Sequence, residues 1–170
     1  NKKTIVLPET SDMRTIEAAG KVLAEGIANI ILVGDKEDIM SRAGDIDLSG
    51  ASFVDPKNYE KFDEYVDAFV EMRRKKGMTE ARAKELLLTN PLYFGCMMVK
   101  QDDADGMVAG AINASADVLR AALQTLKTAP GTRIVSAFFL VVVPDCQYGA
   151  NGTFVFADAG LNQSPSASEL

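Results

Sequence analysis

The sequence predicts an α/β fold with an open, mostly parallel sheet and helices on both faces. Short apolar runs alternate with amphipathic helical patterns along most of the 170 residues. One run, Asn29–Val33, is almost continuously apolar, which is typical of a parallel strand covered on both faces. The chain is long enough for one full domain but not comfortably for two.

The first third of the chain predicts three strands separated by two helices. A helix is indicated over residues 12–25 because apolar residues recur there at three- and four-residue steps, and Gly26 follows its end. The predicted order is strand Thr4–Leu7, helix Asp12–Glu25, strand Asn29–Val33, helix Asp35–Ala43 and strand Ser52–Val54.

The middle of the chain is predominantly helical in pattern. Thr79 precedes an acidic first turn and is a good N-cap residue. The stretch that begins at Pro91 is apolar enough to be a buried helix. The predicted helices are Asn58–Lys76, Thr79–Leu88 and Pro91–Lys100.

The segment Ala104–Lys127 predicts a strand, a tight turn and a helix. The strand is the apolar run Met107–Ala109, and Ser115 is the expected N-cap of the helix. A helix start after a glycine-containing turn gathers unpaired amides and a positive dipole end at one point. The turn Asn113–Ser115 could therefore hold a phosphate or small anion, although most such turns bind nothing.

The C-terminal part predicts a strand pair and then a break. Ile134–Val143 is a long apolar strand, and after a turn Thr153–Ala157 pairs back on it. Ser166 would cap a helix that stops after one turn, and few later elements exist to cover the apolar strand. We expect the natural protein to extend beyond Leu170; the alternative is a short domain with a floppy tail.

Composition excludes several kinds of function. The chain has a net charge of −6, which argues against nucleic acid as a partner, so any anionic ligand needs a local cluster of Arg and Lys. No uncharged apolar stretch is long enough for a membrane span. The absence of histidine excludes a Ser-His-Asp or Cys-His nucleophile and a His-ligated metal within this chain.

Two cysteines, Cys96 and Cys146, make neither a disulfide framework nor a zinc site, so no metal is expected. The first residues lead straight into a strand pattern without a signal peptide, and a reducing, cytoplasmic setting fits both observations. We expect Cys96 to lie in the core. Cys146 follows a strand, but neighbouring Asp145 would raise rather than lower the pKa of its thiol.

Arg73 lies where the helical pattern calls for an apolar side chain. Position 73 continues the apolar line formed by Tyr59, Phe62, Val66 and Phe69. A guanidinium on that line needs an anionic partner or a route to the surface at the end of the helix. Arg74 shares the more solvated line of Asp63, Asp67 and Val70.

Arg120 is the second candidate binding residue. It shares a helix face with Asp117, Gln124 and Lys127, three or four residues away. The simpler interpretation is an exposed Asp117–Arg120 pair that contributes little to stability.

Six strings of the chain form an informative ordered set. They are TIVLPET at 4–10, GIANIILVGD at 26–35, RRKKGMT at 73–79, NPLYFGCMMVK at 90–100, ADGMVAGAINASADVLRAALQTLK at 104–127 and VSAFFLVVVPDCQYGANGTFVFADAG at 135–160. In these strings and their order the sequence resembles the phosphate acetyltransferases (phosphotransacetylases), over essentially all of its residues. Phosphate butyryltransferases share the architecture but resemble these strings less.

The resemblance implies acetyl transfer between acetyl phosphate and coenzyme A, by direct attack of the coenzyme A thiolate on the acyl carbonyl. Coenzyme A would be a substrate, with no tightly bound cofactor and a homodimer as the expected assembly. Arg73 and Arg120 match family arginines that contact coenzyme A, and Asn113 and Ser115 would complete the binding wall. Cys146 would lie near the active site without acting as the nucleophile.

The resemblance also implies an incomplete protein. Family members are about twice as long, so residues 1–130 would form a first α/β domain completed by later residues, and residues 131–170 the start of a second. The catalytic residues would then lie in the absent half. Two alternatives stay open: a non-catalytic acetyl-CoA-binding regulatory domain, and an acyltransferase for longer acyl phosphates such as butyryl phosphate.

Overall fold

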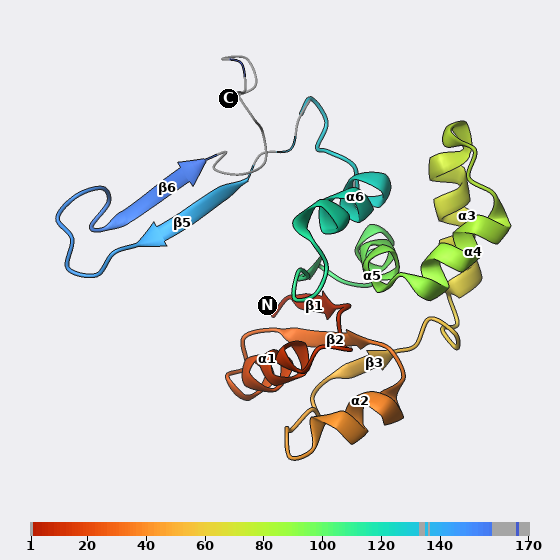
Figure 1. Ribbon diagram of the computed structural model, residues 1–170, viewed down its shortest axis with the longest axis horizontal. Helices are drawn as coiled ribbons and strands as arrows, with labels where there is room; N and C mark the ends of the chain where they lie inside the picture. Colours follow the sequence, from red (N-terminus) through yellow and green to blue (C-terminus); the bar gives the residue numbers. More distant parts are fainter. Residues whose placement is uncertain (1, 133–134, 136, 158–165, 167–170) are drawn as a thin grey trace. The chain divides into compact units, whose positions relative to one another are not determined.

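The computed structural model describes residues 2–132, 135, 137–157 and 166. The chain divides into two compact units, Asn1–Lys127 and Thr128–Leu170. The first unit contains β1 (Thr4–Leu7), α1 (Met13–Ala24), β2 (Asn29–Val33), α2 (Lys36–Ala43), β3 (Ser52–Val54), α3 (Phe62–Arg73), a 3₁₀ turn (Arg74–Lys76), α4 (Glu80–Thr89), α5 (Pro91–Lys100), β4 (Gly106–Met107) and α6 (Ser115–Thr125) (Figure 1).

Four parallel strands form the sheet of the first unit in the order β3-β2-β1-β4. Val6 pairs with Ile31 on one side and with Met107 on the other, which makes β1 a central strand. The chain therefore leaves β1 towards β2 and β3, and returns on the opposite side of β1 as β4. The predicted parallel sheet is confirmed.

Side chains of the central strands alternate between two apolar cores, one on each face of the sheet. Val6, Ile31 and Val33 pack in the core formed with α3, α4, α5 and α6. Leu7, with Ile30 and Leu32 of β2, packs in the core formed with α1 and α2. This alternation follows from the two-residue period of a strand and confirms the prediction of helices on both faces.

Helix α3 is shorter than the pattern predicted, and its predicted start at Asn58 is wrong. Residues 58–61 form turns, in which the amide of Asn58 bonds the carbonyl of Asp55 and that of Phe62 bonds the carbonyl of Tyr59. Asp103 explains the difference, because it accepts hydrogen bonds from Lys61 and from the hydroxyl of Tyr59, and these contacts hold the segment outside the helix.

The capping of α6 also differs from the prediction. Its N-cap is Ala114, which makes no side-chain cap hydrogen bond, and Ser115 is the first helical residue. The interpretation of Ser115 as the N-cap is therefore wrong. The strand before it is only Gly106–Met107, because the chain turns away from β1 after Val108 donates its amide to the carbonyl of Val6.

The second unit contains an antiparallel hairpin of β5 (Phe138–Val142) and β6 (Thr153–Ala157), in which Phe139 is paired with Phe156. The predicted strand pair is thus confirmed over these residues. Residues 134 and 136 of the predicted long strand lie outside the described residues, as do residues 167–170 of the helix predicted after Ser166. No helix in the described part of the chain is long and apolar enough to cross a membrane.

Candidate functional site

A cavity of about 450 Å³ opens in the first unit between the end of α3 and helices α4, α5 and α6. It contains both arginines selected from the sequence, although they lie far apart in the chain. Its lining residues are Arg73, Lys76, Met78, Arg82, Glu85, Leu86, Thr89, Tyr93, Arg120 and Gln124.

Arg73 reaches the cavity because of its phase on α3. Val66 and Phe69 on the same line are 1% and 0% exposed, so the line runs through the core and ends at Arg73. The Nε of Arg73 is buried and has no hydrogen-bond partner among the described residues. A buried guanidinium nitrogen without an acceptor is unfavourable, and an anion in the cavity would correct this.

Arg74 has the opposite environment. It is exposed, it pairs with Glu71 at 3.3 Å, and it does not line the cavity. The helical phase therefore separates two adjacent arginines as predicted, one facing the cavity and the other facing solvent.

Arg120 lines the cavity from α6 and also makes the predicted pair, with 2.5 Å between its Nη1 and Oδ1 of Asp117. Its side chain is 58% exposed. Burial raises the pKa of Tyr93, while the positive charges of Arg120 and Arg73 act in the opposite direction. Both guanidinium groups thus act on one phenol in the cavity wall.

Two further cations of the cavity, Lys76 and Arg82, were missed by the sequence analysis. Gly77 has a φ of 74°, which ends the 3₁₀ turn and reverses the chain towards α4. After this reversal Arg82 of α4 lines the same cavity as Lys76. The basic run at 73–76 was a usable signal, but the place of Arg82 depends on how α4 packs.

Among the described residues, the cavity lining therefore has four basic side chains and one acidic side chain, Glu85. This is the local cationic cluster that an anionic ligand requires on a chain of net charge −6.

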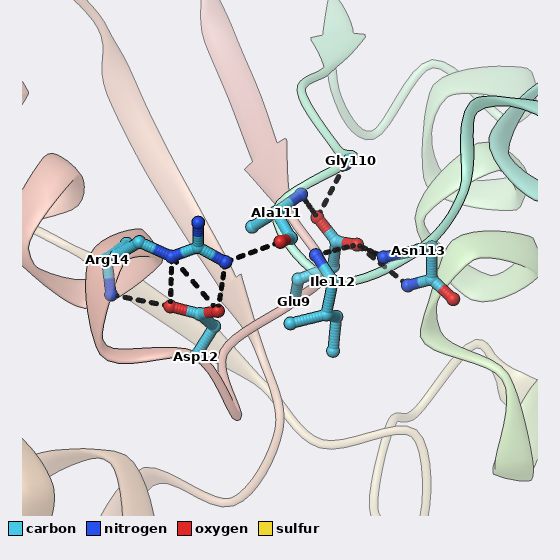
Figure 2. A network of polar contacts seen from close by, with 7 residues as sticks. All are labelled: Glu9, Asp12, Arg14, Gly110, Ala111, Ile112 and Asn113. Atoms are coloured by element: carbon cyan, nitrogen blue, oxygen red, sulfur yellow. Dashed lines mark hydrogen bonds and ion pairs between the residues drawn. The ribbon is translucent and has the colours of Figure 1, made fainter.

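Asn113 and Ser115 lie outside this lining. Ser115 is exposed in the first turn of α6. Asn113 donates its side-chain Nδ2 to Glu9 at 2.7 Å, as Figure 2 shows. The structure thus brings together Arg73 and Arg120 but places the other two predicted residues elsewhere.

The amides of the turn that precedes α6 bind an anion of the chain itself. The Glu9 carboxylate accepts hydrogen bonds from the backbone N–H groups of residues 110–113 (Figure 2). Burial alone would raise the pKa of Glu9, but the hydrogen bonds from Asn113, Ala111 and Gly110 lower it from 4.5 to about 2. The sequence pattern indicates these amides but not the carboxylate that they bind.

The two cysteines have different environments. Cys96 is 0% exposed, which confirms it as a core residue, and burial raises the pKa of its thiol. Cys146 lies in the turn between β5 and β6, where its Sγ is 4.0 Å from the carbonyl oxygen of Tyr148. Among the described residues, no group of three or more His, Cys, Asp or Glu side chains is arranged to hold a metal ion.

Comparison with known proteins extends these observations to a family. A family model described as phosphate acetyl/butaryl transferase matches residues 1–170. The chain belongs to the phosphate acetyl/butaryl transferase family. It is 54% identical over 168 residues to a phosphate acetyltransferase of Acetivibrio thermocellus, and 53% identical over 170 residues to one of Thermoanaerobacterium thermosaccharolyticum.

The alignments cover 99% and 100% of this chain but only 50% and 52% of those two family members. The chain thus spans about half the length of the curated relatives it matches.

The fold agrees with solved structures of the same family. A phosphotransacetylase from Streptococcus pyogenes matches with a TM-score of 0.86 and 35% identity, over 99% of this chain and 50% of that one. The EutD phosphotransacetylase from Staphylococcus aureus gives a TM-score of 0.85 and 33% identity over 99% of this chain and 49% of that one. The predicted family and fold class are confirmed.

Proposed function

We propose that the protein containing this chain transfers an acetyl group between acetyl phosphate and coenzyme A, and that this chain supplies the wall that binds coenzyme A. The observation that carries the second part is the convergence of Arg73 and Arg120 on one cavity with Lys76 and Arg82. Family membership and the names of the relatives support the acetyl-transfer reaction.

The chemistry of the cavity suits coenzyme A. Its phosphates are anions, and guanidinium groups bind phosphate through charge-assisted, often bidentate hydrogen bonds. The orphaned Nε of Arg73 would gain an acceptor from such a phosphate. Met78, Leu86 and Tyr93 supply apolar surface in the same wall for the uncharged parts of the molecule.

In the proposed reaction the coenzyme A thiolate attacks the acetyl carbonyl, a C–S bond forms, and the C–O bond to phosphate breaks. The thiol proton goes to a base and the departing phosphate takes the electron pair. Such a step needs the base, donors for the tetrahedral oxyanion and cations for the phosphate. We place the base and the oxyanion donors in the part of the protein beyond Leu170.

Three other residues keep supporting roles in the proposal. Ser115 offers an exposed hydroxyl to the substrate. Asn113 already donates Nδ2 to Glu9, so any substrate contact would use its side-chain oxygen. Cys146 would lie near the active site without acting as a nucleophile.

For the whole protein we propose a cytoplasmic homodimer of acetate metabolism with coenzyme A, acetyl phosphate and phosphate as its small-molecule partners. It would bind neither nucleic acid nor membrane and hold no tightly bound cofactor. Residues 1–130 and 131–170 would belong to two α/β domains, both completed by later residues. The division of this chain into units at Lys127 and Thr128 supports a boundary close to that position.

The test is acetyl-CoA formation by the full-length protein from acetyl phosphate and coenzyme A. We expect turnover with acetyl phosphate and a clearly lower kcat/KM with butyryl phosphate. Binding of acetyl-CoA without turnover would instead identify a regulatory binding domain. Preference for butyryl phosphate would identify a longer-chain acyltransferase.

A further inference from the structure

Glu9 occupies an anion site built from the backbone of a distant loop. It follows β1 by two residues and is 2% exposed. Its Oε2 accepts hydrogen bonds from the amides of Gly110 at 2.6 Å and Ala111 at 2.7 Å. Its Oε1 accepts from the amides of Ile112 at 3.2 Å and Asn113 at 2.9 Å, and from Nδ2 of Asn113.

Four successive amides that converge on one carboxylate form a nest, the arrangement that proteins often use for phosphate. Gly110 has a φ of 113°, a conformation that the missing Cβ permits and that helps the amides turn inwards. The loop thus has the shape of a ligand site, but the ligand is a side chain of the same chain.

The nest lies where open α/β sheets usually bind ligands. Strand β1 has β2 on one side and β4 on the other, and the chain's connections run in opposite directions from it. Glu9 follows the carboxyl end of β1 and Gly110 follows that of β4. Ligands of such sheets bind outside the carboxyl ends of the strands at this switch point. In this chain the side chain of Glu9 occupies that position and holds the loop.

A second contact holds the same loop from α1. The Nη2 of Arg14 donates to the carbonyl oxygen of Ala111 at 2.5 Å, and Arg14 is itself paired with Asp12 at 2.7 Å (Figure 2). The loop is therefore bound through its amides by Glu9 and through a carbonyl by Arg14.

The loop leads directly into α6, which starts at Ser115 and presents Arg120 to the cavity. Ala114 provides no side-chain cap, so the start of α6 depends on the loop before it. Ala121, next to Arg120, is 0% exposed, so Arg120 lies at the edge of the buried face of α6. A shift of the loop would therefore move the start of α6 and change the direction of Arg120.

We propose that Glu9 is a positioning residue of the coenzyme A site: it holds the 110–113 loop so that α6 presents Arg120 to the cavity. This inference rests on the proposed function. Glu9 contacts no substrate in it and acts only through the loop and Arg120.

The test compares coenzyme A kinetics of Glu9→Gln, Arg120→Ala and the double variant in the full-length enzyme. Glutamine keeps the size of the side chain but points an NH₂ group at amide donors. We expect Glu9→Gln to raise the KM for coenzyme A about tenfold and to leave the KM for acetyl phosphate nearly unchanged. The double variant should be little worse than Arg120→Ala alone, because Glu9 acts through that arginine.

Asp103→Asn is the matched control. Asp103 is also a carboxylate that accepts several hydrogen bonds, from Lys61, Tyr59 and Tyr65, but it does not contact the 110–113 loop. The variant should lower stability without changing the KM for coenzyme A.

Three results would overturn the positioning role: an unchanged KM for coenzyme A in Glu9→Gln, full additivity with Arg120→Ala, or an equal effect of Asp103→Asn. If Glu9→Gln does not fold, Arg14→Ala removes the contact to Ala111, together with the Asp12 pair, and should raise the same KM by a few-fold; no change there would also overturn it. If Arg120→Ala itself leaves coenzyme A saturation unchanged, the proposed function fails separately.

Discussion

The cavity that we propose as an anion site and the 110–113 loop lie in one unit, and they differ in whether the chain supplies the anion. The loop amides are satisfied by Glu9, which is 2% exposed. In the cavity, the buried Nε of Arg73 has no hydrogen-bond partner in the described part of the chain, and the described lining contains four cations and one carboxylate. A site that already has its counter-charge stabilises the fold, whereas a site that lacks one is prepared for a ligand.

The first prediction concerns removal of the internal anion, Glu9, from the 110–113 loop. The pKa of Glu9 is about 2 in the folded chain against an ordinary 4.5. Its stabilisation is therefore complete above pH 4.5 and is lost as the pH falls towards 2. The shift corresponds to about 3 kcal/mol.

We expect Glu9→Gln to lower the free energy of unfolding by about 3 kcal/mol at pH 7, and the difference from wild type to vanish near pH 2. Urea unfolding of the full-length protein at several pH values measures this. Glu17→Gln, at an exposed position of α1, should have little effect at pH 7. A Glu9→Gln variant as stable as wild type at pH 7 would show that the loop does not need its anion.

The second prediction concerns the cavity. Arg73→Ala and Arg120→Ala should each raise the KM for coenzyme A in the full-length enzyme, because each removes a charge-assisted contact worth about 1.5–3 kcal/mol, or roughly 10- to 150-fold. The KM for acetyl phosphate should change much less. Steady-state kinetics at one fixed ionic strength measure both constants.

Arg74→Ala is the control for this experiment, because Arg74 is adjacent in sequence but exposed and paired with Glu71. It should be nearly silent. An equal rise of the KM for coenzyme A in Arg74→Ala would show that helical phase does not separate the two adjacent arginines. An unchanged KM in all three variants would show that coenzyme A does not bind in the cavity.

How much of the cavity and of the 110–113 loop can be predicted from the sequence depends on the range of the interactions that form them. The phase of α3 is local, so the different environments of Arg73 and Arg74 could be predicted from a few helical turns. The continuous apolar run of β2 likewise indicated a strand covered on both faces.

The site that Glu9 forms with the 110–113 loop depends on contacts between residues about a hundred positions apart, which no local pattern contains. The local pattern therefore indicates the amides near Asn113 but does not pair them with Glu9. The late start of α3 has the same origin, because Lys61 and Tyr59 bond the distant Asp103.

The third prediction concerns Lys76 and Arg82, the two cations of the cavity that the sequence pattern does not identify. Lys76→Ala and Arg82→Ala should raise the KM for coenzyme A by about three- to tenfold, because both line the cavity but lie at exposed positions where charge effects are weaker. The increase should shrink as salt is added, which a KM series against ionic strength measures. If Lys36→Ala, on the other face of the sheet, has the same effect, the loss is one of general charge rather than of the cavity.

The prediction with the smallest expected effect concerns Asp117 and the negative charge near the cavity. Asp117 already pairs with Arg120, so part of that arginine's charge is used inside the chain. The pair is half-exposed, and such surface pairs contribute about 0.2–1 kcal/mol. Asp117→Asn should therefore release Arg120 and lower the KM for coenzyme A by about two- to threefold, with stability almost unchanged.

The decrease in KM should disappear in the Arg120→Ala background, because no arginine is then left for Asp117 and the ligand to share. An increased KM would instead show that Asp117 orients Arg120 towards the ligand, and the paired arginine would then belong to a pre-arranged site rather than to a competition between internal and external anions.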